Sequence, residues 1–338
     1  MIIRAAINGY GRIGRCILRA LYESGYRDRI QIVGINELSG LESLVHLTRF
    51  DSTHGRFAGE VTHRDGFMYV NGDKIAVFCE HDIQCLDWDQ LGIDIVFECS
   101  GSFSERLMAQ QHLDSGAKKV IFSSPATRDV DATVVYGFNE HVLQKEHEII
   151  SNASCTTNCS AHVIHMLDTQ FGIEQGVITI VHSSMNDQPV IDAYHNPDLR
   201  KSRSSLHSII PVSTGLAQGI ERLFPHLANR FEAVSLRVPT MNVSMMQLSV
   251  GVARNTSAAE VNNLLREASQ ARLHGILDYT ELPLVSCDFN HNSSSAVIDG
   301  SQTLVSGDRL VTVIAWFDNE WGYANRILDT ALAAIQAG

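Results

Sequence analysis

The sequence lacks any apolar run of the roughly 18 to 20 residues that a membrane-spanning helix requires. Its opening, MIIRAAINGYGRIGR, also lacks the basic, apolar and cleavage regions of a signal peptide. We therefore expect a cytoplasmic protein that has no membrane partner.

Positive charge is also scarce: the chain has 26 Lys and Arg residues and 38 Asp and Glu residues, which gives a net charge of −12. Such an acidic chain is a poor match for a broad nucleic-acid surface, although a local basic patch can still bind a phosphate. We expect the partners to be small molecules or further copies of the chain, and no nucleic acid.

The seven cysteines are odd in number and scattered, so they do not form the disulfide framework of an exported protein. Cys155 and Cys159 are close together, but a structural zinc site needs about four ligands, and no second short-spaced pair of Cys or His stands out. The sequence therefore predicts reduced thiols and no metal.

The composition of the 338 residues, 44% hydrophobic and 19% charged, is that of a globular protein large enough for two domains. The first third alternates short apolar runs with helical stretches, which predicts parallel strands joined by crossover helices. From about residue 176 longer alternating strands predict a mixed or antiparallel sheet. Apolar runs that indicate strands lie at 2–8, around 31, at 94–101 and at 118–124.

These patterns predict an α/β protein with a doubly wound parallel sheet followed by an α+β domain with a mixed or antiparallel sheet. We place the first domain at 1–153, completed by the C-terminal segment 319–338, and the second at 154–318. An amphipathic helix from about Tyr323 to Gln336 is expected to pack back on the first domain. Ser257 and Glu260 predict a capping box at the start of another helix.

Three glycines, Gly9, Gly11 and Gly14, follow the first predicted strand and open the first predicted helix. This context is typical of the Rossmann dinucleotide fingerprint, in which the glycines allow a tight turn, a close approach of the pyrophosphate and close packing of helix on strand. The alternative is an ordinary strand-to-helix turn. Glu37 ends the second strand, where a carboxylate binds ribose hydroxyls and repels a 2′-phosphate, so NAD is favoured over NADP. A solvated surface Glu37 is the alternative.

The stretch SNASCTTNC places Cys155 in the first turn of a predicted helix, where the helix dipole and free N–H groups stabilise a thiolate. A buried packing cysteine remains the alternative. His182 ends an apolar strand and is either a base or an ordinary buried histidine. Arg237 lies in an alternating strand, where it either pairs with a surface carboxylate or binds an anion.

Five blocks spread over the chain, NGYGRIGR, SNASCTTNC, HSIIPVSTG, RVPTMNVS and WFDNEWGY, closely resemble the glyceraldehyde-3-phosphate dehydrogenase superfamily. The stretches INELSG, HSSMNDQPVIDAYHNPDLR and NRFEAVSLRVPT resemble its D-erythrose-4-phosphate dehydrogenase branch. The resemblance implies a small sugar-phosphate aldehyde as substrate, NAD as cofactor and a homotetramer.

The same resemblance implies that Cys155 attacks the aldehyde, that His182 acts as base, and that hydride transfer to NAD leaves a thioester on Cys155. It implies anion-binding roles for Ser154, Thr156, Lys201, Thr214, Gly215 and Arg237, with Asp187 and Gln188 nearby. Besides the glycines, it implies cofactor-binding roles for Arg12, Ile13, Glu37, Ser100, Ser123, Asn319 and Tyr323.

Two positions depart from the glycolytic pattern of that family. Met185 stands where the pattern has a threonine, and Lys201 stands where it has an arginine. Loss of the hydroxyl and of a bidentate guanidinium predicts a weaker phosphate site, which favours water over inorganic phosphate as the attacker on the thioester. The expected product is 4-phosphoerythronate, which in the family context feeds pyridoxal 5′-phosphate synthesis. The alternatives are a phosphorylating glyceraldehyde-3-phosphate dehydrogenase and, more remotely, a nucleotide-binding redox sensor.

Overall fold

The computed structural model describes residues 2–194 and 198–337. Residues 195–197, part of the stretch HSSMNDQPVIDAYHNPDLR, lie outside the described residues, as do the terminal residues 1 and 338 of the predicted domains. The chain divides into two compact units, and each is described by itself: unit 1 comprises Met1–Ser154 with Ala324–Gly338, and unit 2 comprises Cys155–Tyr323.

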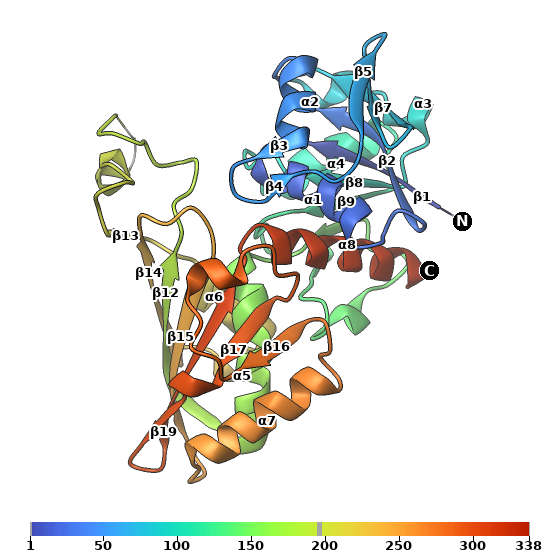
Figure 1. Ribbon diagram of the computed structural model, residues 1–338. Helices are drawn as coiled ribbons and strands as arrows, with labels where there is room; N and C mark the ends of the chain where they lie inside the picture. Colours follow the sequence, from blue (N-terminus) through green and yellow to red (C-terminus); the bar gives the residue numbers. More distant parts are fainter. Residues whose placement is uncertain (1, 195–197, 338) are drawn as a thin grey trace. The chain divides into compact units, whose positions relative to one another are not determined.

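Unit 1 contains a sheet with strand order β10-β11-β9-β8-β1-β2-β7-β6-β5 (Figure 1). Every neighbouring pair from β10 to β7 is parallel, so the predicted doubly wound parallel sheet is confirmed. The inner strands are buried almost end to end, as strands covered on both faces must be. The strands are β1 (Ile3–Asn8), β2 (Ile30–Asn36), β5 (Val61–Arg64), β6 (Phe67–Val70), β7 (Asp73–Phe78), β8 (Ile95–Glu98), β9 (Lys119–Phe122), β10 (Ala132–Thr133) and β11 (Ile149–Ser151).

One edge of this sheet is antiparallel, which the sequence analysis did not anticipate. β6 pairs antiparallel with both β5 and β7. The two turns are Asp65-Gly66 and Asn71-Gly72, and all four residues have positive φ, between 48° and 87°. Turns with positive φ at both central positions match the twist of paired strands, so these dipeptides favour hairpins.

The helices of unit 1 are α1 (Arg12–Glu23), α2 (Leu41–Arg49), α3 (Trp88–Leu91), α4 (Arg106–Asp114) and, from Ala324 onward, α8 (Trp321–Gln336); β3 (Phe50–Asp51) and β4 (Gly55–Arg56) form a separate small ribbon. Side-chain hydrogen bonds fasten α8 within unit 1. Tyr26 Oη donates to Asp329 Oδ1 at 2.9 Å, and Thr330 Oγ1 donates to Asn152 Oδ1 at 2.6 Å. The prediction that the C-terminal helix packs back on the first domain is confirmed.

Unit 2 contains a mixed sheet with strand order β13-β14-β12-β15-β19-β17-β16, and β18 pairs with β19. Residues of β15 alternate between buried and half-buried, so one face forms the core. Figure 1 shows α5, α6 and α7 on the same side of the sheet. The predicted mixed sheet is confirmed. Its strands are β12 (Ile173–His182), β13 (Ile210–Val212), β14 (Phe231–Arg237), β15 (Ser244–Val252), β16 (Leu277–Thr280), β17 (Ala296–Asp299), β18 (Leu304–Ser306) and β19 (Leu310–Phe317).

The helices of unit 2 are α5 (Cys155–Phe171), α6 (Leu216–Leu223) and α7 (Ala258–Gln270). The predicted cap of α7 is present, because Ser257 Oγ accepts a hydrogen bond from Glu260 N at 3.2 Å. The Glu260 carboxylate instead accepts from Thr256 Oγ1 at 3.0 Å. Short 3₁₀ turns lie at Ile83–Cys85, Glu140–Val142, Leu199–Ser202, Pro225–Leu227, Ser286–Phe289 and Gly300–Gln302.

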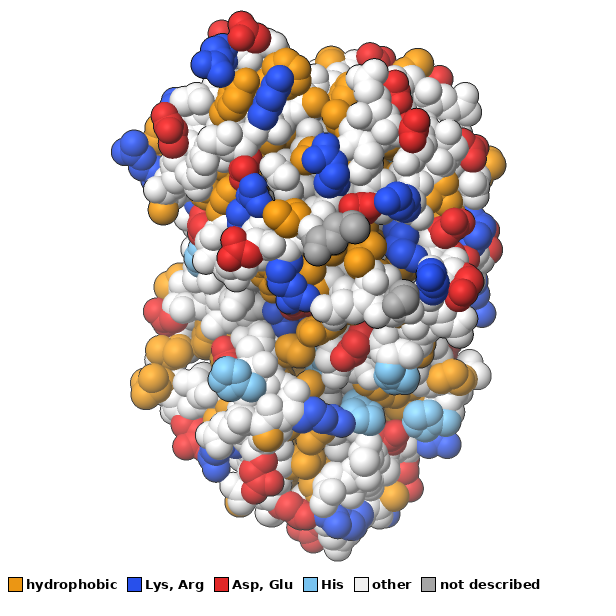
Figure 2. All heavy atoms as spheres, turned by 90° about the vertical axis from the view of Figure 1, so that its right-hand side faces the viewer, with side chains coloured by type: hydrophobic (Ala, Val, Ile, Leu, Met, Phe, Trp, Pro, Cys, Tyr) orange, Lys and Arg blue, Asp and Glu red, His pale blue; other side chains and the backbone are white. Residues whose placement is uncertain are grey.

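Among the residues that the structure describes, none of the helices has both the length and the apolar character needed to cross a membrane. Figure 2 shows basic and acidic side chains interspersed over the face that it presents. None of the seven cysteines, all of which lie within the described residues, forms a disulfide.

Candidate active site

Cys155 is the first residue of helix α5, as the sequence predicted. Its side chain is partly exposed, whereas Cys159, one turn further on, is buried. The sulfur of Cys155 lies 3.8 Å from Nε2 of His182. Since that separation allows a sulfur hydrogen bond, the structure brings the predicted nucleophile and the predicted base together within unit 2.

His182 and Arg237 are the last residues of β12 and β14, and the parallel register of these strands pairs them directly. Arg237 Nη1 lies 2.5 Å from His182 Nδ1, and the same Nδ1 lies 2.8 Å from the carbonyl oxygen of Ser183. Arg237 only donates, so in one tautomer Nδ1 accepts from it and Nε2 carries the ring proton. In the tautomer that can take a proton from Cys155, Nδ1 instead carries the ring proton and donates it to the Ser183 carbonyl, and Nε2 presents a lone pair to the sulfur. The guanidinium is then a positive charge against the opposite edge of the ring.

The electrostatics of this group differ from the thiolate expected at a helix start. Burial raises the pKa of Cys155 to about 11, although Arg237 and the first helical amides act to lower it. Burial and the Arg237 charge together lower the pKa of His182 to about 4. The resting pair at neutral pH is therefore a thiol beside a neutral imidazole, which is the state in which the histidine can accept a proton.

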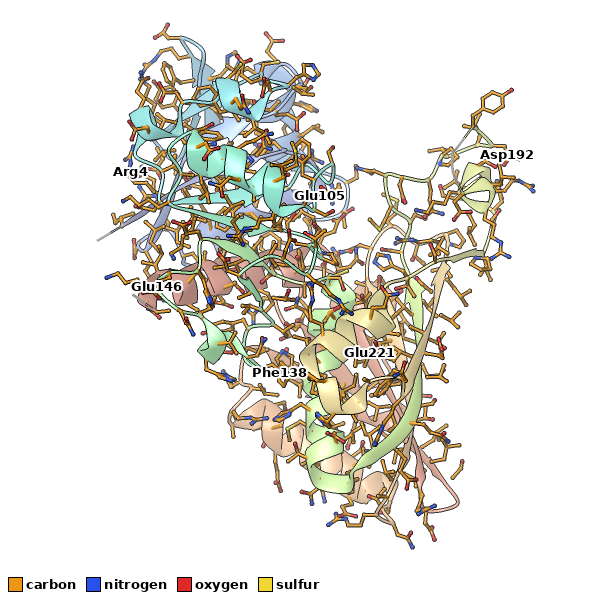
Figure 3. The ribbon with its side chains drawn as sticks, turned by 180° about the vertical axis from the view of Figure 1, so that it is seen from behind. Arg4, Glu105, Phe138, Glu146, Asp192 and Glu221 are labelled. Carbon is orange, nitrogen blue, oxygen red and sulfur yellow. The ribbon has the colours of Figure 1, made fainter. Side chains whose placement is uncertain are left out.

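Residues 183–194 and 198–209, between β12 and β13, include the positions that depart from the glycolytic pattern. Figure 3 shows the part of this segment around the labelled Asp192 standing out from the sheet of unit 2. Lys201 Nζ donates to Asp187 Oδ2 at 2.7 Å. Burial acts to raise the pKa of Asp187, but Lys201 and Arg237 outweigh it and hold that pKa below its usual range. The side chain of Met185 is 45% exposed. The charge of Lys201 is thus already partly neutralised by a neighbour.

The remaining predicted anion-binding residues occupy two helix starts in the chain. Ser154 and Thr156 flank Cys155 at the start of α5, whereas Thr214 and Gly215 immediately precede α6. Thr214 Oγ1 accepts a hydrogen bond from Leu216 N at 3.2 Å, so this hydroxyl helps to begin α6. Cys155 Sγ itself lies near His182 Nε2, and Arg237 acts on the thiol through its charge.

Asn319 is held by two serines that the sequence analysis did not single out. Its Oδ1 accepts hydrogen bonds from Ser183 Oγ at 3.0 Å and from Ser244 Oγ at 2.8 Å. These two bonds occupy both acceptor positions of Oδ1 and fix the orientation of the amide. Its Nδ2 is then the atom that can donate hydrogen bonds to other partners. Ser183 also supplies the carbonyl beside His182, so one residue supports both the predicted base and the predicted cofactor amide.

Asp318 fixes the backbone that follows Asn319. Its Oδ1 accepts from the amides of Glu320 and Trp321, at 3.0 and 2.8 Å. Trp321 begins α8, so Asp318 sets where this helix starts. Tyr323, predicted to flank the nicotinamide, lies in the first turn of α8 and is 5% exposed.

The glycine turn of unit 1 has the geometry that the fingerprint predicts. Gly9 has φ of 88°, and a Cβ there would lie 2.4 Å from Ser100 N. A Cβ at Gly14 would lie 2.3 Å from the carbonyl oxygen of Gly9. A Cβ at Gly11, by contrast, would meet nothing within 4 Å. Packing within the chain therefore explains Gly9 and Gly14, whereas Gly11 leaves open space at the start of α1, where a pyrophosphate is expected.

Comparison with known families gives two matches. Residues 3–106 match the NAD binding domain of glyceraldehyde 3-phosphate dehydrogenase, and residues 154–319 match its C-terminal domain. Together these ranges span well over half of the chain. The protein belongs to the glyceraldehyde 3-phosphate dehydrogenase superfamily. It is accordingly an oxidoreductase with an NAD-binding domain.

Two predicted cofactor residues of this dehydrogenase are engaged with their own chain. The Glu37 carboxylate accepts from Tyr10 N at 2.7 Å and from Leu38 N at 2.8 Å. A carboxylate offers about four acceptor positions, so Glu37 retains capacity for ribose hydroxyls. Arg12 forms an ion pair with Asp51 through Nη1 and Nη2 of its guanidinium, so its side chain is committed within unit 1. Like Arg12, Ile13 lies in the first turn of α1, where backbone amides face an anion.

Ser100 and Ser123 follow two neighbouring parallel strands of the NAD-binding domain, β8 and β9. Ser100 Oγ donates to the Glu98 carboxylate at 2.6 Å, and Ser123 N donates to the Glu98 carbonyl at 2.9 Å. Both serines therefore lie at the carboxyl edge of the sheet, where doubly wound folds bind nucleotides. The glycine turn, Glu37 and these serines fit NAD, and their individual roles toward it stay predictions.

Proposed function

We propose that this dehydrogenase oxidises D-erythrose 4-phosphate to 4-phosphoerythronate with NAD and without inorganic phosphate. Family membership supports the aldehyde chemistry, and the sequence resemblance supports the four-carbon substrate. The observation that carries the proposal is the ion pair of Lys201 with Asp187, at 2.7 Å, on a loop where Met185 offers no hydroxyl. A cation engaged by a carboxylate attracts a second anion weakly.

The proposed chemistry begins at the thiol. Cys155 Sγ bonds to the aldehyde carbon, and the thiol proton passes through His182 Nε2 to the former carbonyl oxygen, which gives a hemithioacetal. His182 then takes the hydroxyl proton. NAD, when bound, supplies the hydride acceptor that converts the hemithioacetal into a thioester. The low pKa of His182, about 4, keeps it neutral and ready to accept each proton.

Hydrolysis completes the proposed cycle. His182 first releases the hydroxyl proton to solvent, and a water molecule then bonds to the thioester carbon and gives one proton to the neutral ring. The carbon–sulfur bond then breaks, and the departing sulfur receives that proton, which regenerates the thiol–imidazole pair. The product is a carboxylic acid, so no phosphate enters the covalent balance. The raised pKa of Cys155, about 11, means that departure of the sulfur needs this proton.

The test compares initial rates of NAD reduction with D-erythrose 4-phosphate and with glyceraldehyde 3-phosphate, each with and without inorganic phosphate. We expect kcat/KM to be at least about tenfold higher for the four-carbon aldehyde, and phosphate to change its rate by less than about twofold. A phosphate-dependent preference for glyceraldehyde 3-phosphate would show the phosphorylating enzyme instead. Absence of NAD reduction with both aldehydes would favour the redox sensor.

The homotetramer and the place in pyridoxal 5′-phosphate synthesis are further parts of this proposal. Val177 and Val234, on β12 and β14, are each 46% exposed. Apolar side chains on an uncovered sheet face are compatible with a second copy of the chain. Light scattering on the intact protein would contradict the tetramer if it gave the mass of a monomer.

A further inference from the structure

Unit 1 contains a buried carboxylate that the proposed chemistry does not use. Glu98 is the last residue of β8, and its side chain is 2% exposed. Its carboxylate accepts four hydrogen bonds: at Oε2 from Asn8 Nδ2 at 2.6 Å and His112 Nε2 at 3.1 Å, and at Oε1 from Ser100 N at 2.8 Å and Ser100 Oγ at 2.6 Å. Each oxygen of the Glu98 carboxylate therefore accepts two hydrogen bonds.

The direction of the His112 bond follows from its other neighbour. Trp88 Nε1 lies 3.0 Å from His112 Nδ1, and an indole nitrogen is only a donor. His112 Nδ1 must therefore accept, which places the ring proton on Nε2, facing Glu98. The imidazole is neutral in this arrangement, so all four donors to the carboxylate are neutral groups.

The network continues across the carboxyl ends of the strands. Asn8 Oδ1 accepts from Asn36 Nδ2 at 2.8 Å, which joins the ends of β1 and β2. Asn36 in turn pairs with the backbone of Glu80, through Oδ1 to N and through Nδ2 to O, both at 2.9 Å. A chain of satisfied buried polar groups thus runs from α3 through β8 and β1 to the residues after β7.

Such an arrangement is costly, since a buried anion with neutral partners gives up its hydration without gaining a counter-charge. An apolar side chain of similar volume would pack there without that cost. What the satisfied network does provide is a single fixed geometry, because each member has one set of partners. A fixed geometry is needed where backbone atoms must meet a ligand.

We propose that Glu98 is the positioning residue of the NAD site. Its carboxylate holds Ser100, a predicted NAD contact, and Asn8, which directly precedes the Gly9 turn. The two turns touch, because a Cβ on Gly9 would lie 2.4 Å from Ser100 N. Moving Ser100 would therefore move the glycine turn as well. This inference needs the NAD-binding domain but not the proposed substrate.

The test is calorimetric titration of the intact protein with NAD, for the wild type and for Glu98→Gln. Glutamine has the same shape, but one of its two ends is an NH₂ group that must face the donors of Ser100 or those of Asn8 and His112. We expect the Kd for NAD to rise about tenfold or more, and kcat at saturating NAD to stay within about twofold. The matched control is Glu105→Gln, an exposed glutamate at the start of α4 (Figure 3), for which we expect an unchanged Kd.

A double-mutant cycle with Ser100→Ala separates positioning from general stabilisation. The single change should raise the Kd about threefold, and the double variant should lose less affinity than the sum of the two separate losses, because both changes loosen the same network that holds the Ser100 turn. Additive losses would overturn the proposal, as would a folded Glu98→Gln with a lower melting temperature and an unchanged Kd. If Glu98→Gln does not fold, Ser100→Ala decides alone, and an unchanged Kd then overturns the proposal.

Discussion

The two units bury acidic groups in opposite ways. Unit 1 surrounds the Glu98 carboxylate with four donors, and each of them is fixed by the fold. Unit 2 gives the Cys155 thiol a helix start and the Arg237 charge, yet burial prevails and the pKa of the thiol rises to about 11. The carboxylate is thus arranged to stay in place, whereas the thiol keeps a proton that its neighbour His182 can take. One unit is built for static geometry and the other for proton movement.

The largest effect is expected from replacing the sulfur of Cys155, on which the proposed proton movement in unit 2 depends. We expect Cys155→Ser to lower kcat on the order of 10³-fold or more, because a hydroxyl is a far weaker nucleophile beside the same imidazole. The Kd for NAD should stay within about twofold, since the change lies in unit 2. Initial rates and calorimetric titration measure the two effects. Cys287→Ser, at an exposed cysteine of unit 2, is the control, and appreciable activity in Cys155→Ser would rule out the covalent route.

The next largest effect is expected at the base. His182→Asn should lower kcat by about 100-fold or more. The wild type should keep a flat kcat/KM from about pH 5.5 to 7.5, because the pKa of His182 is held near 4 and the ring stays neutral there. The variant should instead gain rate as pH rises, since only the small thiolate fraction of Cys155 then attacks.

A pH–rate series on both proteins checks this prediction. An acid limb near pH 6.5 in the wild type, close to the ordinary value for histidine, would contradict the lowered pKa of His182. A variant with the same profile as the wild type would assign the proton transfer to another group. His207→Asn, at an exposed histidine of unit 2, controls for the substitution itself.

The smallest effect is expected at Ser183. This residue tests whether unit 2, like unit 1, also uses fixed hydrogen bonds to position a group. Ser183→Ala removes one of the two hydroxyls that orient Asn319 but keeps the backbone carbonyl beside His182. Loss of one such bond is worth about 1 kcal/mol, so the KM for NAD should rise about fivefold while the pH profile stays unchanged. The control is Ser184→Ala, next to Ser183 in the chain. It removes a hydroxyl that donates to Val238 O, and we expect it to leave this KM unchanged. Equal effects of the two variants would remove the assigned role of Ser183.

Periodicity predicted the strands that carry the sites, because buried parallel strands and half-buried alternating strands leave different patterns along the chain. The predicted run 94–101 is β8, and the alternating run that ends at His182 is β12. The hairpin edge of unit 1 was missed although its signals, Asp65-Gly66 and Asn71-Gly72, are local and readable. No strand was predicted within residues 61–78, so these turn dipeptides had no predicted strands to connect.

Some features of the candidate site follow from neighbouring residues in the sequence, whereas others depend on residues that are far apart in it. The position of Cys155 at a helix start is local, and the sequence predicted it. The pKa of that thiol depends on burial by residues far along the chain, so its rise was not predictable from the stretch SNASCTTNC. The bonds of Asn319 to Ser183 and Ser244 span 136 and 75 positions, and Glu98 meets Asn8 across 90. Contacts of this range exist only once strand register is set.

The ends of the sheet in unit 1 limit how copies of this chain can join. At one end β10 has only two residues, and at the other β5 exposes Thr62, His63 and Arg64. Very short or charged outer strands resist the addition of a foreign strand. Growth of a continuous sheet from chain to chain is therefore disfavoured at both ends, which leaves side-chain contacts as the route by which two copies of unit 1 could associate.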